Sequence, residues 1–213
     1  MSFLDTLRAA FKGGGEQRVP LARSFSSPWS FAAFDPSGGR VPFDYPSAVR
    51  RAFLENPVAQ RAVRIVAEGV GSAPLAQGDE AALRLVAATS AGQSLLETLA
   101  AHLLLHGNGY VQIMRGGDGV PAELFALRPE RVSAVLGADG WPAAYQYKVG
   151  EAALTLPVED AEGWPQVIHL KAFHPGDDHY GAGCLAAADP AVGIHNASAA
   201  WNRALLENAA RPS

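Results

Sequence analysis

Apolar residues first recur at helical spacing directly after Asn56 and Pro57. Asparagine is a favoured N-cap, and proline suits the first helical turn because its missing N–H would have no partner there. Gly69, Gly71 and Pro74 are typical of a helix end. The stretch therefore predicts a helix with an apolar face at period 3.6. That face carries Val58, Ala62, Ile65, Val66 and Val70.

A second helix is predicted from Ser94, because Ser94 and Glu97 have the spacing of a capping box. Its apolar residues follow at helical spacing as Leu95, Leu96, Leu99, Leu103 and Leu104. Full burial of one leucine stabilises a fold by about 1.5–3 kcal/mol. We therefore expect this helix to anchor the core.

The sequence His-Gly-Asn-Gly at 106–109 joins that helix to an alternating stretch. Gly107 falls where a left-handed residue closes the last helical turn. Asn108 and Gly109 are expected to turn the chain. Residues 110–114 then alternate with the period of a strand, Val111 and Ile113 on one side.

Further short strands are predicted at 123–127, 132–136, 143–149 and 167–173, separated by turn residues. Short strands joined by tight turns favour antiparallel pairing. A final helix is predicted over 185–208, with a break at Asp189 and Pro190. The fold class is therefore α+β, with helices packed on a short-stranded, mainly antiparallel sheet.

Residues 1–45 differ from the rest, and we expect them to form a separate N-terminal arm beside a domain at 46–213. After a short helical pattern at 3–11, the arm is rich in glycine, proline and serine and is expected to be partly irregular. Its aromatic residues favour packing, either on a neighbouring surface or back onto the same chain. They are Phe25, Trp29, Phe31, Phe34, Phe43 and Tyr45.

Composition narrows the possible functions. The chain has 213 residues, 48% of them hydrophobic, and a formal net charge of −4 without a basic stripe. Tight binding to nucleic acid through phosphate neutralisation is therefore not indicated. Cys184 is the only cysteine, which excludes an internal disulfide. No run approaches the ~18 apolar residues of a membrane span, so no membrane partner is expected.

Three glycine motifs resemble sites of chemistry but lack the residues that the chemistry needs. His-Gly-Asn-Gly resembles an esterase oxyanion loop, yet no Gly-x-Ser-x-Gly nucleophile elbow is present. Residues 12–16, KGGGE, lack the Gly-Lys-Ser/Thr end of a phosphate-binding loop. Residues 181–186 match G-x-G-x-x-A, but no βαβ unit surrounds them. We therefore assign no catalytic and no cofactor-binding residue.

A cluster of histidines and aspartates offers a metal-site hypothesis. Imidazole and carboxylate are ligands that transition metals prefer. A polar loop in which an aspartate makes a turn is the alternative. The cluster comprises His169, His174, Asp177, Asp178 and His179. The carboxylates of Glu159, Asp160 and Glu162 belong to an expected solvated loop.

Three segments, in order, resemble the phage portal proteins of the HK97 type. They are NPVAQRAVRIVAEGVGSAPL at 56–75, LLLHGNGYVQIMRGGDGVPAELFALRPERV at 103–132, and VIHLKAF followed by YGAGCLAAA and ALLENAARPS within 167–213. Cys184, Ala186 and Ala209 depart from the usual serine, proline and glycine of that pattern. The composition and short arm also resemble portals of gene transfer agents, phage-like particles that package host DNA.

The resemblance implies a structural, non-enzymatic subunit without cofactor, in a ring that is commonly dodecameric. Such a ring occupies one capsid vertex of a virion or phage-like particle assembled in the bacterial cytoplasm. Its partners would be further copies of itself, the major capsid protein, the terminase large subunit, a head–tail adaptor, and double-stranded DNA that passes through without sequence specificity. Residues 46–213 would form a wing-like region, with stem, clip and crown outside this chain.

Two alternatives stay open at this level. One is a metal-dependent enzyme that uses the loop from His169 to His179. The other is a binding module whose aromatic N-terminal arm recognises a partner chain.

Gly107→Val tests the left-handed helix cap. A β-branched residue is strained at positive φ, so we expect a markedly lower melting temperature by circular dichroism. An unchanged melt would remove the left-handed cap from this account.

Overall fold

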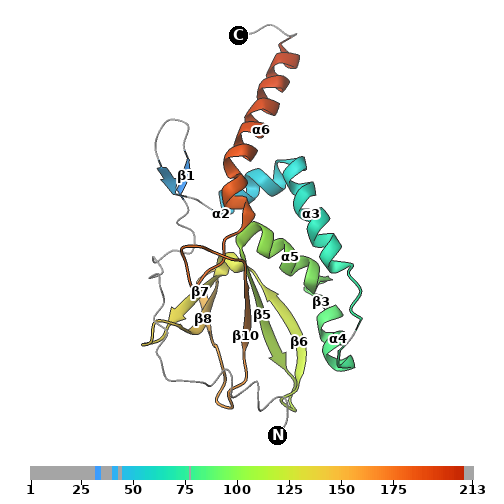
Figure 1. Cartoon of the computed structure of the whole chain (residues 1–213), viewed down its shortest axis with the longest axis vertical. Coiled ribbons are helices and arrows are strands. Elements are labelled where there is room, and N and C mark those ends of the chain that lie inside the picture. The colour runs from blue at the N-terminus through green and yellow to red at the C-terminus, as the bar shows by residue number, and fades with distance from the viewer. Residues whose placement is uncertain (1–31, 35–39, 43–44, 77, 209–213) are drawn as a thin grey trace.

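The computed structural model describes residues 32–34, 40–42, 45–76 and 78–208. Helices lie along one end and one flank of the molecule, two small sheets form the other end, and α6 projects away from both (Figure 1). The predicted α+β class and the mainly antiparallel pairing are confirmed. Most of the predicted arm, with its helical pattern and most of its aromatic residues, lies outside the described residues.

The helical part begins with α2 (Tyr45–Val49), a π-helical turn η1 (Arg50–Leu54) and α3 (Pro57–Gly71). After α4 (Glu80–Ala87) and a small hairpin of β3 (Thr89–Ser90) and β4 (Gln93–Ser94), α5 (Leu95–His106) packs along α3. The last helix, α6 (Cys184–Glu207), contacts η1, α2 and α5 through its first turns.

Two three-stranded antiparallel sheets follow α5. The first has the order β10-β5-β6, from β5 (Asn108–Arg115), β6 (Pro121–Leu127) and β10 (Val167–Lys171). The second has the order β7-β8-β9, from β7 (Val132–Leu136), β8 (Pro142–Val149) and β9 (Ala152–Pro157), with the 3-10 turn η2 (Pro129–Arg131) between the sheets. A further short pair, β1 (Ala32–Phe34) with β2 (Arg40–Pro42), precedes α2.

Three apolar clusters hold these layers together. The two sheets pack face to face through Tyr110, Leu127, Val132, Tyr145, Leu156 and Val167. On the opposite face of the first sheet, α5 packs through Leu95 and Leu99 against Val111. The helices meet around Ala48, Ala52, Leu105, Leu185 and Val192. Helix α5 therefore contacts both the first sheet and the other helices, because it carries apolar residues on more than one face.

Side chains and glycine define the helix ends. Asn56 is the N-cap of α3, and its Oδ1 accepts from the N–H groups of Val58 and Ala59 at 3.1 and 2.9 Å. Ser94 Oγ accepts from the N–H of Glu97 at 3.4 Å at the start of α5. Gly107 ends α5 with φ 78°, and its N–H donates to the carbonyl of Leu103.

The apolar face of α3 points outward rather than into the core. Val58, Ile65 and Val66 are 63%, 55% and 48% exposed. The helix instead packs inward through small residues, chiefly Ala67, which is 3% exposed, with Ala59 and Val63. An apolar helix face usually turns to the core. Its exposure here means that nothing among the described residues covers it.

Several boundaries differ from the sequence expectation. Helix α6 runs unbroken through Pro190, because Leu185 and Val192 are buried on either side of it and Asp189 pairs with Arg51. Strand β9 was not among the predicted elements, although Leu154 and Leu156 alternate with Ala153 and Thr155; only Leu156 of these is buried. Helix α4 was not among the predicted elements either, and none of its residues is buried. No helix among the described residues is long and apolar enough to span a membrane.

Asn56→Ala tests the cap of α3. Asn56 is 3% exposed, and its Nδ2 also donates to Asn196 Oδ1 on α6 at 2.8 Å. Loss of the cap costs about 1 kcal/mol and the unpaired Asn196 adds to this, so we expect an unfolding free energy lower by about 2 kcal/mol.

Asp79→Ala is the matched control, because Asp79 caps the exposed helix α4 through Ala82 N–H at 3.3 Å. Urea denaturation of both variants should show the larger loss at Asn56. Equal losses would mean that the link from Asn56 to α6 adds nothing.

Candidate functional site

The carboxamide of Asn108 is the most connected polar group of the molecule's centre, and it is 2% exposed. Its Oδ1 accepts from Gly181 N–H at 2.7 Å and from His169 Nε2 at 2.9 Å. Its Nδ2 donates to the carbonyls of His106 and Gly181, both at 3.2 Å. One amide thus joins the end of α5, strand β10 and the loop that leads into α6. Asn108 and Gly109 begin β5, so the predicted turn at these two residues is wrong; Gly107 makes the corner.

Three glycines let the backbones meet around this amide. A Cβ on Gly181 would lie 2.0 Å from Gly107 O, and one on Gly183 would lie 2.8 Å from Gly107 N. A Cβ on Gly107 would lie 2.4 Å from the backbone of Ala182 and Gly183. Such distances exclude any side chain. The G-x-G pattern at 181–183 is therefore explained by close backbone packing, and not by a nucleotide phosphate.

His169 occupies the space between the two sheets beside this corner. Its ring stacks on Tyr110 at 4.3 Å between centroids and meets Tyr145 edge-on at 5.6 Å. Because Asn108 Oδ1 can only accept, His169 Nε2 carries the proton, and Nδ1 is left to accept from the Tyr145 hydroxyl at 3.3 Å. The imidazole ring of His169 is thus neutral, and a hydrogen bond at each of its nitrogens fixes its orientation.

Burial sets the protonation of the groups near this corner. It lowers the pKa of His169 and of His102 to about 4, and that of His106 to about 2. Lys171 lowers that of His169 further, and Arg128 that of His102, by like-charge repulsion. Burial also raises the pKa of Tyr145 to about 12. Desolvation disfavours each charged form. The imidazole rings of His102, His106 and His169 are therefore neutral near pH 7.

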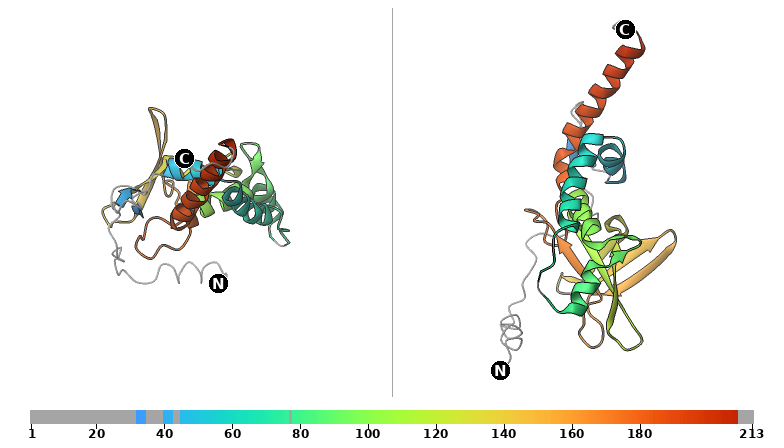
Figure 2. Two further views of the ribbon diagram at one scale, coloured as in Figure 1. Left: turned by 90° about the horizontal axis from the view of Figure 1, so that it is seen from above. Right: turned by 90° about the vertical axis from the view of Figure 1, so that its right-hand side faces the viewer.

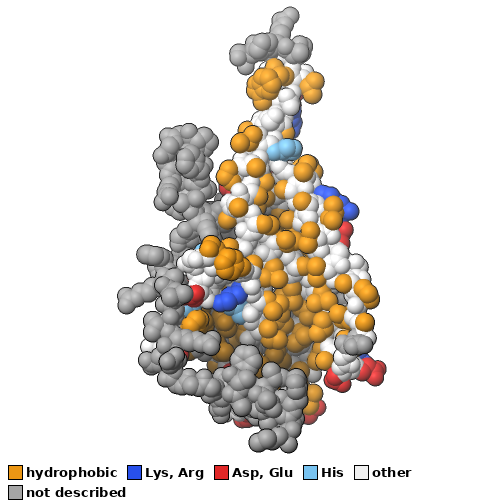
Figure 3. Space-filling model, in the orientation of Figure 1, with side chains coloured by type: hydrophobic (Ala, Val, Ile, Leu, Met, Phe, Trp, Pro, Cys, Tyr) orange, Lys and Arg blue, Asp and Glu red, His pale blue; other side chains and the backbone are white. Residues whose placement is uncertain are grey.

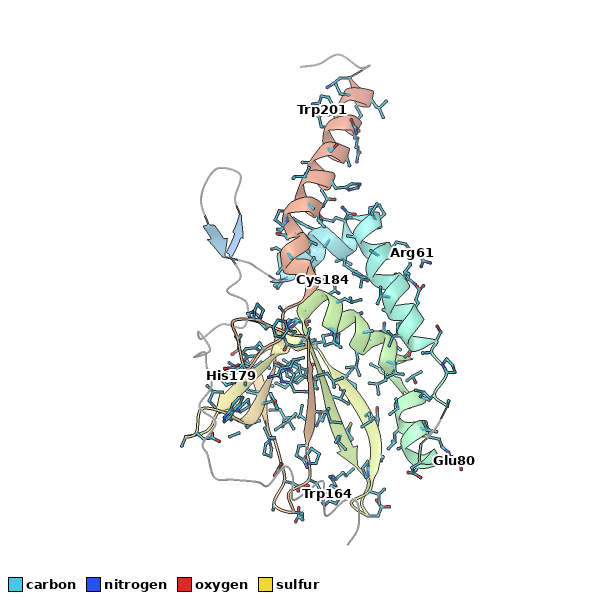
Figure 4. All side chains as sticks on the ribbon, in the orientation of Figure 1. Arg61, Glu80, Trp164, His179, Cys184 and Trp201 are labelled. Atoms are coloured by element: carbon cyan, nitrogen blue, oxygen red, sulfur yellow. The ribbon has the colours of Figure 1, made fainter. Side chains whose placement is uncertain are left out.

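The structure does not bring the histidine cluster together. His169 lies inside the sandwich, whereas His179 is 2% exposed and packs edge-on against Trp141 beside the second sheet (Figure 4). His174 Nδ1 accepts from Gly176 N–H, and Asp177 Oδ1 accepts from the N–H groups of His179 and Tyr180. Across the described residues, no three His, Cys, Asp or Glu side chains are placed to hold a metal ion.

The other candidate residues also serve the fold. Asn56 and Pro57 start α3, at the end that contacts α6. Ser94 and Glu97 start α5, where Glu97 lies against Gly71 of α3 so closely that a Cβ on Gly71 would be 2.9 Å from Glu97 Cβ. Sequence reasoning missed His169 and Gly181 as partners of Asn108. The paired glycines at 181 and 183 were the only available sign of a close backbone approach.

The described geometry therefore defines a polar, close-packed corner that joins the helices to the two sheets. Residues 57–213 match the phage portal protein family, and the chain belongs to that family.

Curated relatives include an uncharacterized protein of Rickettsia felis, 31% identical over 174 residues, and one of Rickettsia bellii, 30% identical over the same length. Each match covers 76% of this chain and 44% of the relative. The chain thus spans less than half the length of these relatives.

The chain is also similar to chains in solved structures of gene transfer agent particles. A chain in the virion of a native gene transfer agent particle is 37% identical, with a TM-score of 0.72 over 100% of this chain and 52% of that one. A chain in the neck of the native particle, computed with C12 symmetry, is 36% identical with a TM-score of 0.71 over the same shares. A chain in the neck of the empty particle, computed with C6 symmetry, is 36% identical with a TM-score of 0.70.

Asn108→Ala should destabilise the fold severely. The substitution leaves the buried His169 Nε2 and both polar groups of Gly181 without their partner. One unsatisfied buried group costs about 1–3 kcal/mol, so we expect a loss of at least about 3 kcal/mol by urea denaturation. Asn208→Ala, at the exposed end of α6, is the control and should change stability by less than about 0.5 kcal/mol. Similar effects of both substitutions would contradict the role of Asn108.

Stability should also fall in acid. Histidines whose pKa drops to about 4 in the folded state bind fewer protons than in the unfolded state below pH 6.5. Their contribution is present above pH 6.5 and is lost as the pH falls toward 4, by about 1.4 kcal/mol per pH unit for each. Urea titrations across this window should show it. His102→Leu should reduce the slope by one proton, whereas Asn208→Ala, which removes no titratable group, should leave it unchanged; equal slopes in all three proteins would contradict this origin.

Proposed function

We propose that this chain is a structural portal subunit of a phage-like particle of the gene transfer agent type. The observation that carries the proposal is the match of the whole chain, at 36–37% identity, to subunits of gene transfer agent virions and necks. On this proposal the chain contributes a wing-like part of a ring through which DNA is packaged and released.

The interior of the molecule supports a structural role rather than catalysis. His106, Asn108 and His169, which could do chemistry, are engaged with one another or with the backbone. A conduit needs rigid walls and weak attraction for the moving strand. The net charge of −4 agrees with this, because basic walls would hold DNA through its phosphates. We therefore infer that the protein is not an enzyme and needs no cofactor.

The shape of α6 supports participation in an assembly. The helix extends beyond the body, and Trp201 lies toward its far end (Figure 4). Ile194, Trp201 and Leu206 on this helix are 72%, 63% and 81% exposed. Large apolar side chains on a projecting helix favour burial against other chain segments or other subunits.

The proposed partners follow from the family. Copies of the chain form a cyclic ring, for which C12 symmetry of the similar neck structure favours twelve subunits. The ring contacts the major capsid protein, the terminase large subunit and a head–tail adaptor, and double-stranded DNA passes through it without sequence specificity. It resides in the particle after assembly in the bacterial cytoplasm. The arm at 1–45 and the domain at 46–213 are the proposed division of the chain.

Native mass spectrometry with negative-stain imaging tests this proposal. Cyclic species of about a dozen copies are expected at high protein concentration, since a closed ring uses one repeated interface. Strictly monomeric protein under these conditions would contradict a ring made by this chain. Stoichiometric bound metal that is lost in His174→Ala and His179→Ala would instead favour the metal-enzyme alternative.

A further inference from the structure

One broad side of the molecule is unusually apolar. The outward face of α3 presents Val58, Ile65, Val66 and Val70, each between 43% and 63% exposed. Charge is confined to its border, where Arg61 and Arg64 both pair with Glu68 at 3.0 and 2.9 Å. An amphipathic helix that faces solvent with its apolar side requires a cover.

The apolar side continues across α5 onto the first sheet. Ile168 and Leu170 of β10 are both 39% exposed. They lie on the face of the first sheet against which α5 packs, but α5 covers β5 and β6 and leaves β10 open. A Cβ on Gly109 would contact Leu99, Leu103 and Leu170 at 3.3–3.9 Å, so β10 and α5 meet here without a gap. Figure 3 shows hydrophobic side chains gathered over this region. We call it the helical surface; it consists of Val58, Ile65, Val66, Val70, Ile168 and Leu170.

Strand β10 adds to this surface an edge without a partner strand among the described residues. It pairs with β5 on one side, and no described strand pairs with its other side. Protein chains usually protect such an edge, since its free N–H and C=O groups invite another chain. Ile168 and Leu170 lie along this edge, and its one charged residue, Lys171, stands at the end of the strand and donates to the carbonyl of Asp178.

A second apolar surface lies on the opposite side of the molecule. The hairpin of β8 and β9 projects away from the body, on the side opposite β10 (Figure 2). Val149 and Leu154 near its tip are 47% and 50% exposed, because the tip extends past the first sheet. Tyr147, which pairs with Leu154, and Phe125 of β6 line a hollow of about 490 Å³ that arginines and a glutamate also line. We call Tyr147, Val149 and Leu154 the hairpin surface.

We propose that the helical surface of one subunit packs against the hairpin surface of the next copy around the ring. This inference rests on the proposed function. A closed ring with more than two members is built head to tail, so each subunit needs two different surfaces on opposite sides. The residues that define both surfaces are aliphatic or aromatic, and such side chains are common at the centres of protein interfaces. A second copy therefore supplies an apolar partner for each of the two surfaces.

Cysteine cross-linking in the full chain tests the pairing. In a Cys184→Ser background, Ile65→Cys and Leu154→Cys are introduced separately and together, and the proteins are treated with a short bis-maleimide. Only the double variant should give a ladder of covalent oligomers, because each head-to-tail contact joins one thiol of each kind. Val120→Cys with Leu154→Cys is the control, since Val120 is 57% exposed on the turn between β5 and β6, outside both surfaces.

The remaining outcomes separate this inference from the proposed function. One outcome is that native mass spectra show rings although the double variant cross-links no better than the control. That result would overturn the inference and leave the portal proposal standing. A dimer from Ile65→Cys alone would indicate a two-fold contact and overturn it as well. Monomers without any ladder would overturn both.

Charge substitution gives an independent measurement. Ile65→Asp should lower the fraction of rings at least tenfold, whereas Val120→Asp, at a similar exposure, should preserve it. Both substitutions are at exposed positions, so the monomer's melting temperature should stay unchanged. Rings from Ile65→Asp at the level of the unsubstituted chain would overturn the inference.

Discussion

The buried carboxamide of Asn108 is the interaction on which the rest of the structure depends. It uses its oxygen and its nitrogen together, accepting from Gly181 and His169 and donating to two backbone carbonyls. An amide with both kinds of group can satisfy donors and acceptors at one point, which a hydroxyl or a carboxylate cannot do as fully. Because the groups that it joins come from α5, β10 and the loop before α6, their relative positions are set at this single place.

Two consequences follow for the surroundings of Asn108. The backbones of Gly107, Gly181 and Gly183 approach so closely that no side chain fits between them. His169 is held as a neutral donor between Tyr110 and Tyr145, which ties the two sheets to the corner. The histidines near the corner thus contribute shape and hydrogen bonds, and their low pKa values follow from the burial that this packing requires.

A rigid interior of this kind fits a protein that acts through its surfaces. Asn108 and His169 are engaged inside the molecule, while branched apolar side chains of α3, β10 and the β8–β9 hairpin face outward. Membership of the portal family, together with the ring symmetry of the similar neck structures, gives these surfaces a common explanation. On the proposed function, the exposed residues of this chain are buried when copies of it assemble.

The sequence alone determined the main helix ends and the family. Asn56, Ser94 and Gly107 mark helix ends through bonds within four residues, so their pattern is visible in one dimension. Only the tertiary structure decided that β10 returns to pair with β5, that Asn108 meets His169 and Gly181, and that α3 turns its apolar face outward. Periodicity identifies which residues share a face, but it carries no information about what that face meets. That depends on contacts between residues more than sixty positions apart, as between Asn108 and His169 or Gly181, which no local spacing encodes.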